Sequence, residues 1–170
     1  MQNTQLDKNI LSKIYSKDSE QTKEAIEEIK EKKDSRYLPA LFELFKPETP
    51  DLVKENILTF IRDLKSQDSV PLIMEMLSKT EEEEDLVRLA SACWQSRLDF
   101  GNYLHNFVSL IIGYNYQVAL EAYTVIENSI FSIDKDHLPG EIDRLKGALG
   151  EISEEKKPLV MEAIKSLQES

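Results

Sequence analysis

The chain has 170 residues and a formal net charge of −11, because 32 acidic residues outnumber 21 basic ones. A single domain commonly holds about 100 to 200 residues, so we expect one domain over residues 1–170. The acidic charge disfavours a nucleic-acid-binding protein, because such proteins neutralise phosphates with basic surface. A single cysteine excludes an internal disulfide.

The first five residues, Met1 to Gln5, lack the basic and apolar blocks of a signal peptide. No apolar run approaches the roughly 20 residues that a membrane-spanning helix needs. We therefore expect a soluble, cytoplasmic protein that is not attached to a membrane.

Apolar residues recur three and four positions apart along the chain, as they do on the buried side of amphipathic helices. The period-2 alternation of strands and the Asn-Gly or Asp-Gly turns of hairpins are missing from the sequence. The pattern predicts an all-α fold of about ten helices, at 6–16, 19–33, 36–46, 50–65, 69–79, 82–97, 102–112, 115–131, 139–149 and 154–168.

Small polar residues before these helices are expected to cap their first turns. The helices near 36 and 69 also carry a proline in the first turn, where its missing N–H costs little. Thr80 and Glu83 have the spacing of a capping box. The expected caps are Ser35, Thr49, Ser69 and Thr80.

Two parts of the chain repeat each other. Leu38-Pro39 aligns with Val70-Pro71, and Asp51-Leu52-Val53-Lys54 aligns with Asp85-Leu86-Val87-Arg88. A repeat of 20 to 50 residues is typical of stacked supersecondary units. The short connections between the helices predict five antiparallel pairs.

These motifs resemble the HEAT-like repeat family of armadillo-type α-solenoids, in which a proline opens the first helix of a pair and Asp-x-Val-Arg opens the second. The resemblance implies a right-handed α-α superhelix with divergent capping repeats at 1–33 and 136–170. In each motif we expect the Asp to face the amides of the helix start and the Val to pack inward. The rival tetratricopeptide fold would need a Trp-x-x-Leu-Gly-x-x-Tyr pattern, which no predicted helix carries.

Residues that could carry chemistry are few. His105 and His137 lack the spacing of metal ligands, and Cys93 lies on an apolar helix side, where burial is expected. Trp94 aligns with apolar residues of the other repeats and is expected in the core. No glycine-rich phosphate loop is present. We therefore predict no catalytic residue, no metal and no cofactor.

Some charged and aromatic residues have two interpretations. The acidic run at 81–85 fits a first helical turn, and if it has a function it is a contact for a basic partner. The lysines at 30, 32 and 33 fit the end of a helix, where positive charge complements the helix dipole and the free carbonyls. Tyr114 and Tyr116, in a short turn, either fix the helix junction or contact a partner.

The resemblance implies a non-catalytic scaffold that binds a protein or peptide, expected to have a basic patch, along the face formed by the second helices. The candidate partner-binding residues are Lys54, Arg62, Asp63, Arg88, Arg97, Tyr114, Tyr116, Glu121, Glu127 and Asn128. The alternative is a HEAT-like enzyme or enzyme regulator, of lyase or glycosylase type, with Asp63 as a catalytic carboxylate. The charge of −11 disfavours the glycosylase version, because its groove would need cations for phosphates.

Overall fold

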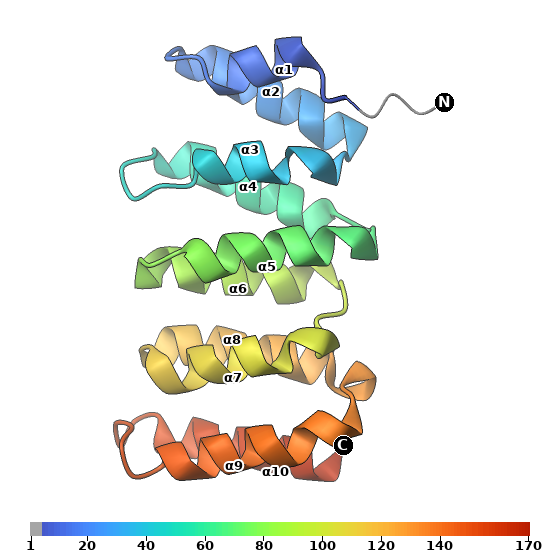
Figure 1. The fold of residues 1–170 in the computed structure, drawn as a ribbon. Helices are drawn as coiled ribbons and strands as arrows, with labels where there is room; N and C mark the ends of the chain where they lie inside the picture. Colours follow the sequence, from blue (N-terminus) through green and yellow to red (C-terminus); the bar gives the residue numbers. More distant parts are fainter. Residues whose placement is uncertain (1–4) are drawn as a thin grey trace. The chain divides into compact units, whose positions relative to one another are not determined.

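A computed structural model describes residues 5–170 (Figure 1). Residues 1–4, on which the signal-peptide prediction partly rests, lie outside this range. Residues 5–170 form ten α-helices and five short 3-10 helices, with no strand among them. The all-α prediction is therefore confirmed. Within this range, no helix combines the length and the apolar character needed to cross a membrane.

The chain divides into two compact units, at residues 1–80 and 81–170. The α-helices of the first unit are α1 (Lys8–Ile14), α2 (Ser19–Lys32), α3 (Leu38–Glu43), α4 (Asp51–Asp63) and α5 (Val70–Lys79). Those of the second unit are α6 (Glu83–Ser96), α7 (Leu104–Gly113), α8 (Tyr116–Asn128), α9 (Leu138–Ala148) and α10 (Lys157–Glu169). Every helix begins and ends within about three residues of its predicted range, the usual uncertainty of helix boundaries. The single domain and the superhelix of five pairs stay predictions.

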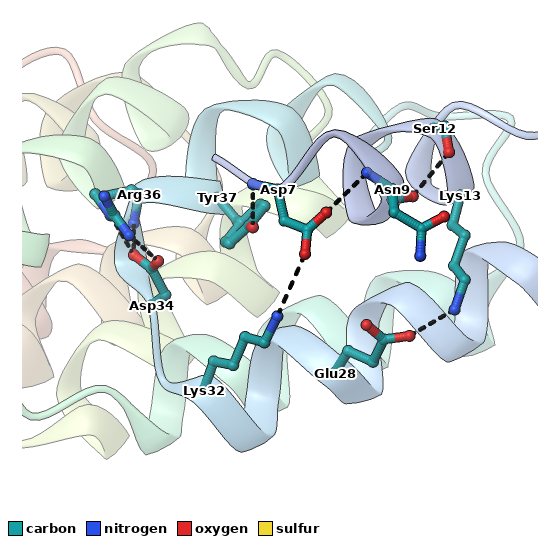
Figure 2. Close-up of polar contacts among 9 residues, drawn as sticks. All are labelled: Asp7, Asn9, Ser12, Lys13, Glu28, Lys32, Asp34, Arg36 and Tyr37. Atoms are coloured by element: carbon teal, nitrogen blue, oxygen red, sulfur yellow. Dashed lines mark hydrogen bonds and ion pairs between the residues drawn. The ribbon is translucent and has the colours of Figure 1, made fainter. Parts of the chain in front are cut away.

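In the first unit, α1 packs against α2 and α3, α2 packs against α4, and α3 packs against α5. Polar contacts tie both ends of α1 to its neighbours (Figure 2). The backbone N–H of Asp7 donates to the hydroxyl of Tyr37 at 3.0 Å, and Tyr37 is buried. Lys13 pairs with Glu28 at 2.5 Å, and Lys32 lies 3.9 Å from Asp7. The two ion pairs are partly exposed and contribute little stability, so packing carries this unit.

Neither Ser35 nor Ser69 makes the predicted capping hydrogen bond. Short 3-10 helices, Ser35–Tyr37 and Gln67–Ser69, precede α3 and α5. Ser35 therefore lies inside a 3-10 helix, whereas Ser69 stands at the N-cap of α5 without a side-chain cap. Asp34 caps the first of these 3-10 helices, where its Oδ1 accepts from the N–H of Arg36 at 3.1 Å. The hydroxyl of Ser69 is buried without a hydrogen-bond partner among the described residues. The prolines, in contrast, lie in the first turn of each helix as predicted.

The predicted caps at Thr49 and Thr80 are wrong for a different reason. The hydroxyl of Thr49 donates to the carbonyl of Leu44, and that of Thr80 donates to the carbonyl of Met76 at 2.9 Å. Both hydroxyls therefore satisfy carbonyls at the end of the preceding helix, where acceptors are left without an intrahelical partner. Neither α4 nor α6 has a side-chain cap.

In the second unit, α8 packs against α6, α7 and α10, and α9 packs against α7 and α10. The core between these helices is apolar, with Leu86, Leu89, Val108, Ile111, Val118, Ala122, Leu145 and Val160 all fully buried. Phe100 and Phe107 meet edge to face with ring centroids 5.8 Å apart. Such a contact adds about 0.5–1.5 kcal/mol to the burial of the rings.

The connection from α6 to α7 crosses the connection from α8 to α9 at close range, and we call this crossing the 99–132 junction. A Cβ added to Gly101 would lie 2.6 Å from the Ser132 Oγ and 2.9 Å from its carbonyl carbon. The N–H of Phe100 donates to the Ser129 hydroxyl at 3.0 Å, and the Ser132 hydroxyl donates to the Asp99 carboxylate. Only glycine permits this approach of two backbones.

We predict that Gly101→Ala lowers the free energy of unfolding by about 1–3 kcal/mol, because the added methyl group overlaps the backbone of residue 132. The matched control is Gly147→Ala in α9, where an added Cβ meets nothing within 4 Å. That change should raise stability by about 0.5–1 kcal/mol, the helix preference of alanine over glycine. Urea unfolding followed by circular dichroism measures both, and equal effects of the two changes would contradict the close approach.

Candidate functional site

The starts of α6, α8 and α10 are held together at one end of the second unit. The carboxylate of Glu83 accepts from the backbone N–H of Asn115 at 3.2 Å and from its side-chain amide at 2.5 Å. The ammonium group of Lys156 donates to the carbonyls of Ile112 at 2.9 Å and Tyr114 at 2.6 Å. Lys156 is buried, and burial lowers its pKa. It therefore acts as a structural donor that closes the end of α7.

Aromatic side chains connect the same helices farther along. The indole N–H of Trp94 on α6 donates to the Glu121 Oε2 on α8 at 2.7 Å. The hydroxyl of Tyr123 on α8 donates to Glu127 at 2.7 Å and lies 2.8 Å from the Ser166 hydroxyl on α10, which acts as the donor. Burial raises the pKa of Tyr123 to about 12, so this proton stays in place at neutral pH. The starts of the helices lie together, and the later parts of α6 and α10 lie beside the middle of α8. These helices therefore run in one direction.

The outward sides of α6 and α8 form the candidate binding surface, which we call the α6–α8 face. Its residues are Ser91, Trp94, Gln95, Leu120, Glu121, Thr124, Glu127 and Asn128. Leu120 is 39% exposed and lies on the outer ridge of α8. Thr124 and Asn128 follow at intervals of four, and each hydrogen-bonds the carbonyl four residues before it. The ridge is therefore a fixed surface that mixes apolar and polar groups.

Three of the predicted partner-binding residues lie on this face, namely Glu121, Glu127 and Asn128. The two glutamates are already engaged by aromatic side chains of the same unit. Arg88 on α6 is half-buried, and Arg97 is exposed at the C-terminal end of α6 with a left-handed φ of 61°. A partner would therefore meet a surface whose acidic groups are held in position.

The candidate residues of the first unit lie on α4. Lys54 does not project into solvent as expected, because it is only 5% exposed and its ammonium lies 5.5 Å from the ring centroid of Phe45. Arg62 pairs with Glu55 at 2.5 Å. Asp63 is exposed as the last residue of α4 and is not the recessed carboxylate that the enzyme alternative requires.

The two copies of the repeat motif occupy different positions in their helices. α4 begins at Asp51, whereas α6 begins at Glu83, two residues before Asp85. Leu52 is consequently 66% exposed while its equivalent Leu86 is fully buried. The motif valines, Val53 and Val87, are both half-buried, so they pack inward without being fully enclosed.

Trp94 is half-buried, so its predicted place in the core is wrong. Its repeat equivalents Phe60 and Val125 are buried and have no polar side-chain atom. The indole N–H of Trp94 requires an acceptor and finds one in Glu121, at the surface. Tyr114 and Tyr116 are also half-buried, and the backbone of Tyr114 closes the end of α7, where its N–H donates to the carbonyl of Leu110 and its carbonyl accepts from Lys156.

A polar cluster between α7 and α9 was not predicted from the sequence. The Nδ1 of His105 lies 2.8 Å from the carboxylate of Glu141, which is buried and also paired with Arg144. Arg144 donates to Ser109 at 2.8 Å as well. His105 and Glu141 line a shallow hollow of about 440 Å³ that also includes His137. In residues 5–170 no group of three or more His, Cys, Asp or Glu is placed to hold a metal ion.

Comparisons with known proteins add no relative. No family model, no curated protein and no solved structure matches this chain.

We predict that Trp94→Phe lowers the free energy of unfolding by about 1–2 kcal/mol, because it removes a hydrogen bond to a charged acceptor. Urea unfolding in a double-mutant cycle with Glu121→Ala isolates this contact. Trp94→Phe should cost clearly less in the Glu121→Ala chain. An equal cost in both chains would show that the loss comes from packing alone.

Cys93 is buried as predicted, and burial raises its pKa to about 12. We predict that a thiol reagent at pH 8 labels the folded chain on the order of a thousandfold more slowly than the chain in denaturant, because only the thiolate reacts. A matched control places the thiol at an exposed site, with Asn128→Cys in a Cys93→Ala chain. Equal labelling rates of Cys93 and this control in the folded state would contradict the burial.

Proposed function

We propose that this chain is a non-catalytic interaction scaffold of the HEAT-like repeat kind. In this proposal, antiparallel helix pairs stack as a right-handed α-α superhelix, and a protein or peptide partner binds along the second helices of the pairs. The observation that carries the proposal is the packing of α6, α8 and α10 side by side in one direction. Second helices stacked in this way offer a continuous surface to an extended partner.

The distribution of charge supports a basic partner for the second unit. Residues 81–170 contain 17 acidic and 8 basic residues, a formal charge of −9, whereas residues 1–80 carry only −2. A field of this sign attracts basic protein segments and repels phosphate backbones. We therefore propose a protein or peptide with a basic patch as the partner and no nucleic acid.

The composition of the α6–α8 face supports protein binding as well. Trp94 and Leu120 offer apolar surface, and polar side chains surround them. Interface centres are enriched in tryptophan and other aromatic residues, and lysine is depleted there. The α6–α8 face contains no lysine.

The proposal is tested with the combined change Leu120→Ala, Thr124→Ala and Asn128→Ala on the ridge of α8. Alanine favours helix, so this variant should remain folded. Proteins captured from cells of the source organism are purified, and their affinity for the chain is measured by calorimetry. We predict that the triple variant binds the partner at least about tenfold more weakly, and that the affinity of the unchanged chain falls with added salt.

The matched control is Asn106→Ala on α7 together with Lys146→Ala on α9, at exposed positions outside the α6–α8 face. This control should bind as the unchanged chain does. The proposal fails if every purified partner binds the triple variant and the control equally well.

A further inference from the structure

Phe131 is fully exposed, at 100%, in the short 3-10 helix Ile130–Ser132 that follows α8. Among the phenylalanines Phe45, Phe60, Phe100 and Phe107 are buried and Phe42 is half-buried. Burying a phenylalanine side chain stabilises a protein by about 1.5–3 kcal/mol. Because its side chain stays in solvent, Phe131 contributes none of this stabilisation to the fold.

The segment that carries Phe131 is held rigidly at the 99–132 junction. The hydroxyl of Ser129 accepts from the N–H of Phe100 at 3.0 Å, and the N–H of Ser132 donates to the carbonyl of Ser129 at 3.0 Å. The Ser132 hydroxyl, which donates to Asp99, also lies 2.7 Å from the same carbonyl. Ile133 is buried directly after this turn. The backbone is therefore fixed on both sides of Phe131, and the side chain of Phe131 projects from it into solvent.

Charged residues lie close to Phe131 in the sequence. Asp99 belongs to the junction itself, and Asp134 and Asp136 follow Phe131 by a few residues. The basic residues nearby in the sequence are Arg97 and Lys135, so the acidic side chains outnumber the basic ones, as they do in the whole unit. An anionic lipid surface would be repelled by this charge. The complementary surface is apolar where Phe131 enters and basic around it.

We propose that Phe131 is the anchor of the partner contact, and that it inserts into an apolar pocket rimmed by lysine or arginine on a separate protein. This inference rests on the proposed function, because it requires a protein partner. It adds which residue of this chain anchors the contact and which chemistry the partner's pocket has. Phe131 follows Asn128, the last residue of α8, by three positions, so the anchor lies just beyond the end of the helix that carries the ridge of the α6–α8 face. Because the backbone of this turn is already fixed, binding has to order only the side-chain rotamer of the aromatic residue, which suits a residue that dominates an interface.

The test uses the full chain with a photo-crosslinking residue in place of Phe131. A protein crosslinked in cells of the source organism is purified and its affinity is measured by calorimetry. Phe131→Ala should weaken binding roughly 30-fold or more, as an interface anchor does. Asp136→Lys should weaken it about threefold, by replacing attraction to the basic rim with repulsion. Both variants should melt at the temperature of the unchanged chain, because Phe131 is fully exposed and Asp136 lies on the surface.

The matched control is Met161→Ala on α10, which removes another exposed apolar side chain, 61% exposed, and should leave binding unchanged. If the α8 ridge variant weakens binding and Phe131→Ala does not, the anchor is wrong and the proposed function stands. If neither variant weakens binding, both are wrong. The anchor is also overturned if no crosslink forms, if Phe131→Ala dissolves a dimer of this chain in ultracentrifugation, or if only neutral phosphatidylcholine vesicles bind in a Phe131-dependent way.

Discussion

The second unit depends on the approach of two backbones at residues 101 and 132. This contact sets the α6–α7 connection against the α8–α9 connection, and so fixes how far α6 and α8 are displaced along each other. With that displacement fixed, the indole of Trp94 reaches Glu121 and the starts of α6 and α8 meet through Glu83. A side chain at position 101 would separate the two connections. The displacement of α6 along α8 and the geometry of the binding surface therefore depend on the same steric requirement.

Acidic residues serve two separate purposes in this unit. Glu83, Glu121 and Glu127 accept hydrogen bonds from Asn115, Trp94 and Tyr123, and Glu141 accepts one from Arg144. These carboxylates have a structural explanation. Other acidic residues, such as Asp136 and Asp143, are exposed and make the surface charge negative. The charge of −9 therefore overstates the acidic surface that a partner could contact, although the sign remains negative.

The helices were predictable because their signal is local. Apolar spacing, prolines and glycines mark every helix to within a few residues, and burial of Cys93 follows from the same spacing. Features that depend on distant residues were not predictable. The cluster of His105, Glu141 and Arg144 joins residues 36 and 39 positions apart, with no motif to connect them. The predictions for Trp94, Thr49 and Thr80 were wrong because they used only the spacing of residue types along the chain. Spacing does not show which polar group a side chain can reach in the folded protein.

The position of Phe131 on an ordered turn affects how much conformational entropy is lost when a partner binds. A mobile loop with an aromatic tip would bind only after losing conformational freedom, and part of its burial energy would be spent on that loss. At the 99–132 junction this entropy is lost during folding instead. The packing of four helices already fixes Phe100, Gly101 and Ser129 before any partner binds. Binding then needs to desolvate only one ring. The same constraint that aligns α6 with α8 thus prepares a contact for a second protein.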